Sequence, residues 1–194
     1  MGNQAKSRST GAYFRDRAGR SLLFVTGSQK AAADSGTSVA PGLARLHVVT
    51  QPGQPAFLRL DRVQPELVLQ NPGSPVVTSH RRRDAIVWVL DPDKPRSASL
   101  YGADAPRPVL YAVDAETMAL LWRSPAGLLH TSGKYNEPVI ARGTVFVGTD
   151  RLQAFGLWPP GQAPAPFTAP AASPASVAKT ASVATDAALA QGRV

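Results

Sequence analysis

The chain has 194 residues and a formal net charge of +8, from 21 lysines and arginines against 13 aspartates and glutamates. It has no cysteine, which excludes disulfides, thiolate metal sites, a cysteine nucleophile and covalent c-type haem attachment in this chain. Hydrophobic residues make up 43% of the sequence and charged residues 18%, so a folded core is expected rather than disorder driven by charge repulsion.

The composition divides the chain into three parts. Residues 1–10 are polar and are expected to be a disordered N-terminus. Residues 11–158 alternate apolar runs with turn residues and are expected to fold, while residues 159–194 form a Pro/Ala-rich tail. The first twenty residues contain no hydrophobic stretch, so no signal peptide is expected in this chain. No apolar run approaches the roughly 18 residues of a membrane helix, so no membrane span is expected.

Ten short runs rich in Val, Leu, Ile and aromatic residues follow one another through the folded region. Each is four to six residues long and is bounded by Gly, Pro, Asp or Ser, as is typical of strands. The runs are 21–26, 45–50, 56–60, 74–78, 85–90, 109–113, 119–123, 138–141, 144–148 and 152–156. No segment before residue 185 has a sustained helical period, so the sequence predicts an all-β fold.

The runs recur in the same order. Run 74–78 is followed by a turn and run 85–90, just as run 138–141 is followed by a turn and run 144–148. A weaker earlier copy begins at 21–26. Their spacing suits a four-stranded propeller blade of about 40–50 residues with inserted loops. We therefore expect a partial β-propeller of about two and a half blades, with an ordinary β-sandwich as the alternative.

One segment, Val109–Arg123, carries a motif. Its residues Ala112, Asp114, Thr117 and Trp122 fall on the pattern A-x-D-x-x-T-G-x-x-x-W. Alanine is small enough to lie under an aromatic ring, and aspartate can accept backbone N–H groups in the turn that follows its strand. Tryptophan supplies a large flat face that can pack between sheets. These four residues are expected to form a structural docking motif.

This motif resembles the repeat signature of the quinoprotein-like β-propellers, which include pyrroloquinoline-quinone (PQQ) dehydrogenases and non-catalytic relatives. The stretch Glu137–Leu157 is similar to the closing segment of that family, and the resemblance covers about residues 12–157. One departure is Met118, where the family prefers glycine, which puts the geometry of the turn in doubt. Since propellers close with about four to eight blades, the resemblance implies that this chain is the C-terminal fragment of a longer propeller.

The resemblance leaves two functions open. In the first, the parent protein is a periplasmic quinoprotein oxidoreductase that uses PQQ with calcium and passes electrons to a cytochrome c domain. In the second, the propeller is a non-catalytic scaffold for protein–protein interaction, whose partner is the remainder of the propeller or another protein. This chain alone contains no haem-binding motif and is expected to be inactive. The tail 159–194 is either a linker into a cytochrome c domain or a disordered tail.

The loop that leads into run 138–141 is the expected place of a cofactor site. Lys134, Asn136 and Glu137 lie there, and the resemblance implies that such residues contact the carboxylates and carbonyls of a quinone. The alternative is that they are solvated loop residues. The three histidines are far apart and share no metal-ligand spacing, so no metal site is expected.

The sharpest charge cluster is Arg81-Arg82-Arg83. It lies between two expected strands and is followed at once by Asp84, so a solvated turn is expected there. No aromatic residues are interleaved with these arginines to stack on bases, so nucleic-acid binding is not expected.

Overall fold

The computed structural model describes residues 9–27, 42–94, 105, 107–130, 137–149 and 151–156. This part of the chain is all-β and forms eleven strands without a helix. The strands are β1 (Ala12–Arg15), β2 (Ser21–Thr26), β3 (Leu43–Val49), β4 (Phe57–Val63), β5 (Val76–His80), β6 (Arg83–Asp91), β7 (Val109–Asp114), β8 (Leu120–Arg123), β9 (Val139–Ala141), β10 (Thr144–Gly148) and β11 (Leu152–Gly156). The predicted all-β class is confirmed.

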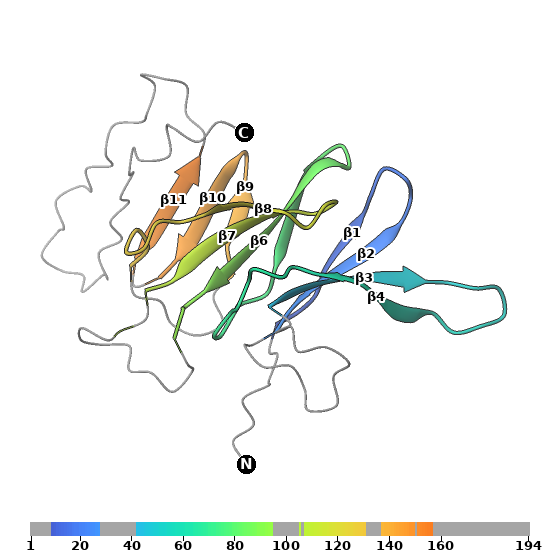
Figure 1. The fold of residues 1–194 in the computed structure, drawn as a ribbon. Coiled ribbons are helices and arrows are strands. Elements are labelled where there is room, and N and C mark those ends of the chain that lie inside the picture. The colour runs from blue at the N-terminus through green and yellow to red at the C-terminus, as the bar shows by residue number, and fades with distance from the viewer. Residues whose placement is uncertain are drawn as a thin grey trace, which may run out of the picture.

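The strands form three antiparallel sheets, each a simple meander. Sheet A has the order β1-β2-β3-β4, sheet B the order β5-β6-β7-β8, and sheet C the order β11-β10-β9. Figure 1 shows the three sheets fanned out in chain order, from sheet A in blue and cyan to sheet C in orange. The first strands of successive sheets also touch, since β1 contacts β5 and β5 contacts β9.

All ten predicted runs lie on strands, and β1 is an additional strand that the sequence did not indicate. It is only four residues long and pairs with β2 from Ala12 opposite Phe24 to Arg15 opposite Ser21. With β1, the first sheet has four strands rather than three. The described residues therefore form three sheets, two of them four-stranded.

Two separate cores hold the sheets together. The first lies between sheets A and B and includes Leu22, Phe24 and Leu43 from one side and Val87 and Val113 from the other. The second lies between sheets B and C and is built from Leu90, Leu110, Leu129, Val145, Val147 and Phe155. Sheet B is thus covered on both faces, which explains why its strand β6 is an almost continuous apolar run.

Two backbone segments approach each other closely at the start of β3. A side chain at Gly42 would place its Cβ 2.0 Å from the carbonyl oxygen of Leu67, so only glycine fits there. Leu67 and Leu69 belong to the segment between β4 and β5, and both are buried in the first core. The segment that connects sheet A to sheet B therefore packs directly against the backbone at the start of β3.

Several predictions fall on residues that the structure does not describe. The tail 159–194 and residues 1–8 lie outside the described residues. Of the expected N-terminal segment 1–10, Ser9 and Thr10 are described, and the backbone N–H of Thr10 donates to Ser74 Oγ at 3.0 Å. Within the described residues no helix is long and apolar enough to cross a membrane.

Candidate functional site

The motif in Val109–Arg123 forms the hairpin of β7 and β8 at the junction of sheets A and B. Asp114 ends β7, and its Oδ1 accepts hydrogen bonds from the backbone N–H of Glu116 at 2.9 Å and of Thr117 at 2.6 Å. The Thr117 hydroxyl donates to the same oxygen at 2.9 Å. The carboxylate therefore satisfies the inward N–H groups of the turn, and the turn's carbonyl groups remain available to other partners.

Met118 occupies the position where the resembled motif prefers glycine. Its φ is 63°, which lies in the left-handed region that favours glycine. Its backbone N–H still donates to the Asp114 carbonyl at 2.9 Å, so the turn closes with methionine in place of glycine. The Met118 side chain is buried in the first core. Packing of that side chain offsets the backbone strain.

Ala112 and Trp122 lie on the face of sheet B that points toward sheet C. Ala112 lies directly opposite Trp88 on β6 and directly opposite Trp122 on β8. Both tryptophans pack against the second core, and the Trp88 indole N–H donates to Thr78 Oγ1 at 2.9 Å. The small Ala112 side chain therefore separates two large rings in one row across the sheet.

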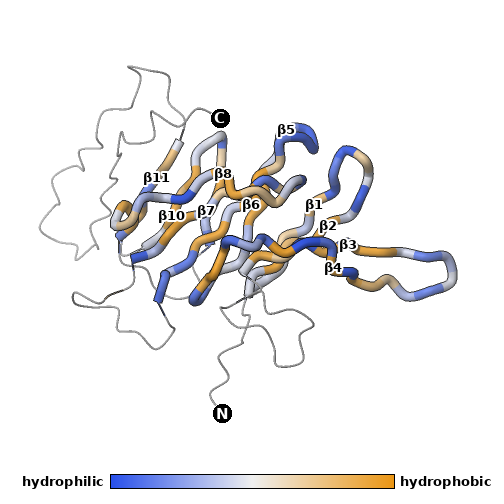
Figure 2. The backbone as a smooth tube through the Cα atoms, viewed as in Figure 1, coloured by the Kyte–Doolittle hydropathy of each residue, from blue (hydrophilic) through white to orange (hydrophobic). Residues whose placement is uncertain are grey.

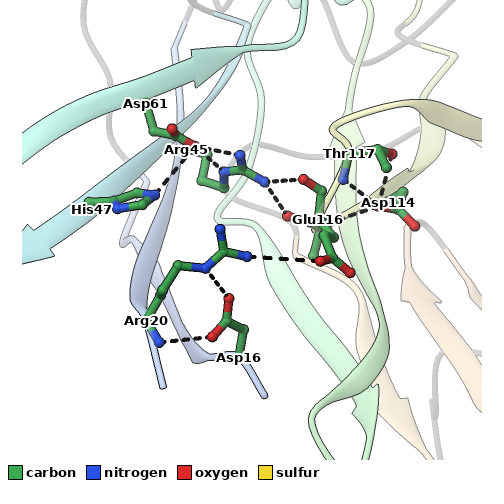
Figure 3. Close-up of polar contacts among 9 residues, drawn as sticks. Asp16, Arg20, Arg45, His47, Asp61, Asp114, Glu116 and Thr117 are labelled. Atoms are coloured by element: carbon green, nitrogen blue, oxygen red, sulfur yellow. Dashed lines mark hydrogen bonds and ion pairs between the residues drawn. The ribbon is translucent and has the colours of Figure 1, made fainter. Parts of the chain in front are cut away.

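Arg45 of sheet A holds the motif turn of sheet B (Figure 3). Its Nη1 donates to the carbonyl oxygens of Ala115, at 2.8 Å, and Glu116. On the other side its guanidinium pairs with Asp61, with Nε donating to Oδ2 at 2.5 Å. The Arg45 residue is only 6% exposed, so a buried cation joins two sheets through one carboxylate and two carbonyl groups.

A β-bulge brings the partners of Arg45 to the same face. Arg45 pairs with Arg62, but the next residue, Leu46, pairs with Leu60, so Asp61 is the extra residue on β4. Bulges re-aim side chains, and here Asp61 reaches Arg45 while Arg62 Nη1 donates to the Thr117 carbonyl at 2.9 Å. Three successive carbonyl groups of the motif turn thus accept from two arginines of sheet A.

Two carboxylates near this junction have a lowered pKa. Partial burial works to raise the pKa of Asp61, but the hydrogen bond and charge of Arg45 outweigh burial and hold this pKa below its ordinary value. Burial likewise works to raise the pKa of Asp16, and its hydrogen bonds and ion pair with Arg20 lower it. Arg20 Nη2 also lies 3.9 Å from Glu116 Oε1, which adds a weak third link to the motif turn.

A buried carboxylate, Asp91, has the opposite shift. It is 0% exposed at the end of β6, and burial raises its pKa despite hydrogen bonds from the backbone N–H groups of Gln70 and Asn71, each 2.8 Å long. These bonds fix the segment that leads into β5. In sheet C the buried Gln153 does the same for the loop before β9, by accepting from His130 N and donating to the Leu128 carbonyl.

The predicted cofactor residues are only partly described. Lys134 and Asn136 lie outside the described residues, and Glu137 is exposed two residues before β9. Within the described part of the chain no group of three or more His, Asp or Glu side chains could hold a metal ion. The structure therefore brings together the four motif residues on the β7–β8 hairpin of sheet B, whereas Glu137 lies on the segment that leads into β9 of sheet C.

Sequence reasoning missed Arg45, Asp61 and Arg62. Arg45 interrupts the apolar run 43–49, and a cation inside a buried strand needs a partner. That interruption was the available signal. The carbonyl partners lie 70 residues farther along the chain, so their identity could not be deduced from spacing. Comparison with known proteins adds no further constraint, because no family model, curated protein or solved structure matches this chain.

Proposed function

We propose that sheets A, B and C are consecutive blades of a β-propeller of the quinoprotein-like type, and that this segment is an assembly scaffold. Two features support the propeller. The first strands of successive sheets contact each other, as they do where inner strands surround an axis. Each pair of neighbouring sheets also packs face to face around its own core.

The apolar outer face of sheet A carries the proposal. The strand register places Tyr13, Leu23, Leu46, Leu58 and Leu60 on the face that points away from sheet B. Tyr13 is 59% exposed, Leu58 54% and Leu60 56%, and neither core contains any of the five. On the opposite face, toward sheet B, the same strands carry Arg45, His47 and Arg62 beside the core residues Leu22, Phe24 and Leu43.

This distribution differs from that of a terminal sheet. An outermost sheet normally directs its polar face to solvent and its apolar face to the core. Sheet A is apolar on both faces: Leu22, Phe24 and Leu43 pack toward sheet B, and Leu58 and Leu60 of the outer face are exposed, as in a sheet whose next neighbour is missing. Sheet C has a smaller counterpart, since Val139 is 61% exposed and Leu152 43%. We infer that further β-sheets, from the remainder of the parent or from a second chain, cover these two faces.

Self-association of the full chain tests the proposal. Sedimentation velocity should show concentration-dependent association, because exposed apolar faces recruit other chains. The double variant Leu58→Lys and Leu60→Lys should reduce the association strongly. Leu121→Lys, at a leucine that is 37% exposed on β8, is the matched control and should leave it unchanged. A wild-type chain that stays monomeric at high concentration would contradict the proposal.

A quinoprotein oxidoreductase as the parent protein, with a periplasmic location, is proposed on the resemblance of the motif. PQQ carries several carboxylates and calls for cationic and amide donors. Glu137, the described residue among the three candidates, is an exposed carboxylate and would repel them. Of the three candidate residues, the one that is described therefore supplies neither a cation nor an amide for PQQ, and oxidation is proposed for the parent only. The full chain supplied with PQQ and calcium should reduce no dye above a blank when offered alcohols or sugars.

A further inference from the structure

Two turns rich in arginine lie side by side at one end of the molecule. One joins β1 to β2 and contains Arg17, and the other joins β5 to β6 and contains Arg81 and Arg82. Both are hydrophilic loops at the same end of the sheets (Figure 2). Between them lies a hollow of about 340 Å³ lined by Arg17, His80, Arg81 and Arg83, which we call the arginine hollow.

The arginine hollow has no acidic residue in its lining. A larger adjoining cleft of about 580 Å³ shares Arg17 and Arg83 with it and also contains Asp16, Asp84 and Glu116. Asp16 and Glu116 are paired with Arg20, and Asp84 follows Arg83 directly in the chain. In the described ranges of the chain, Arg17, Arg81, Arg82 and Arg83 form no ion pair, and all four are exposed. Three arginines from two sheets thus line the hollow, while Arg82 and Asp84 line the adjoining cleft.

The β5–β6 turn carries arginines at positions where its backbone favours other residues. His80 pairs with Arg83, so Arg81 and Arg82 form a two-residue turn, with φ of 47° and 65°. Such a turn favours Asn-Gly, because both residues are left-handed. Sheet C makes the equivalent turn with Arg142 and Gly143, at φ of 51° and 76°. Arg82 therefore occupies a position where this chain elsewhere uses glycine.

We propose that the arginine hollow binds a phosphoryl group of an anionic ligand. Guanidinium groups bind carboxylates and phosphates through paired N–H donors. A phosphoryl group presents three terminal oxygens and more charge than a carboxylate, so it can be shared by three separate guanidinium groups. The hollow spans sheets A and B, since Arg17 belongs to one and Arg81 and Arg83 to the other. Its small volume suits one or two phosphoryl groups rather than a folded segment.

Calorimetric titration of the full chain with inorganic pyrophosphate at low ionic strength tests the proposal. The double variant Arg81→Asn and Arg82→Gly installs the preferred turn residues and removes one cation from the lining of the hollow and one from the adjoining cleft. It should raise the melting temperature and weaken pyrophosphate binding at least about tenfold. Arg17→Gln, on the other sheet, should also weaken binding. A purely structural role of these arginines predicts a lower melting temperature instead.

The matched control removes the same charge elsewhere. Arg59→Gln combined with Arg142→Gln eliminates two exposed arginines outside the hollow and should change the affinity by less than about twofold. An equal loss in this control, no binding of pyrophosphate, or equally tight binding of citrate would each overturn the proposal. DNA binding without pyrophosphate binding would overturn it as well.

Binding to lipid vesicles distinguishes the two possible sources of the phosphoryl group. Capture of the protein on phosphatidylcholine vesicles that contain phosphatidic acid is compared with capture on vesicles of phosphatidylcholine alone. If the protein is captured only on the former, and the double variant Arg81→Asn and Arg82→Gly is no longer captured, the phosphoryl group is that of a lipid headgroup. Pyrophosphate binding without capture on either vesicle would identify a soluble phosphorylated ligand. Both results support the site.

Discussion

Arg45 and Arg62 lie directly opposite each other on β3 and β4, and both donate to carbonyl groups of one turn in the next sheet. Two cations side by side across a strand pair repel. The arrangement is stable because Asp61, displaced by a bulge, and the carbonyl groups of the β7–β8 turn surround the guanidinium groups. The junction of sheets A and B therefore depends on polar groups as well as on the apolar core.

The two arginines should differ strongly in their contribution to stability. Arg45 is buried, so Arg45→Ala leaves Asp61 and two carbonyl groups without their partner and should cost about 3–5 kcal/mol of unfolding free energy. Arg62 is exposed, so Arg62→Ala should cost less than about 1 kcal/mol. Urea unfolding midpoints of the two variants measure the difference. Equal midpoints would contradict the role assigned to Arg45.

Asp61 should make the stability depend on pH in the acid range. Its pKa in the folded protein lies below the ordinary value of 3.8, so its contribution is present above pH 3.8 and is lost as the pH falls through the folded pKa. At neutral pH, Asp61→Asn should cost about 1–3 kcal/mol, because the Arg45 charge loses its carboxylate while water still reaches part of the site. As the pH falls through the folded pKa of Asp61, below 3.8, the variant and the wild type should converge. A difference that stays constant across this range would exclude the ion pair as its cause.

At Met118 the glycine variant should be more stable than the alanine variant, which is the reverse of the usual order. Removing the buried side chain costs about 2–5 kcal/mol for either residue. At a φ of 63° glycine avoids a left-handed strain of about 1–2 kcal/mol that alanine keeps. Met118→Gly should therefore be more stable than Met118→Ala in thermal melts.

The control for this inversion is Leu121, which is exposed on the strand that follows the turn. There Leu121→Gly should be less stable than Leu121→Ala by about 0.5–1 kcal/mol, as in an ordinary strand. The same order at both positions would mean that Met118 is not held in the left-handed conformation in solution.

The sequence predicted much of the fold because the strand signals are local. Apolar alternation and turn residues mark every strand except β1, whose burial is only intermittent and which depends on pairing with β2. The motif also pointed to an unusual backbone at Met118, where glycine is preferred, and the positive φ that favours glycine is present there. The turn nonetheless forms because the core, which no local pattern describes, accepts the methionine side chain.

The inter-sheet contacts could not be predicted in the same way. The bulge at Asp61 changes which side chains share a face, and nothing in the run Phe57–Val63 marks it. The alternation in β3 and β4 is clear, but it suggests that the leucine face is the core face. In the structure the opposite face, with Arg45 and His47, points to sheet B. Only the arrangement of the sheets decides this.

Ala112 should tolerate no larger side chain, because Trp88 and Trp122 flank it on the neighbouring strands. Ala112 is only 4% exposed, so Ala112→Leu should lower the unfolding free energy by about 1–3 kcal/mol through overpacking. Ala119→Leu, at an exposed position of the same hairpin, should change it by less than about 0.5 kcal/mol. Denaturant unfolding of both variants measures the contrast.

A double variant separates overpacking from loss of strand propensity. If leucine at Ala112 collides with the ring of Trp122, then Trp122→Leu should make room for it. The combined variant should be more stable than the sum of the two single losses predicts, with a coupling of about 0.5–3 kcal/mol. Additive losses would show that Ala112 and Trp122 do not pack against each other. The row of Trp88, Ala112 and Trp122 would then not join sheet B to sheet C. A positive coupling that also disappears in Phe155→Ala would connect this row to the second core, in which Phe155 is 6% exposed.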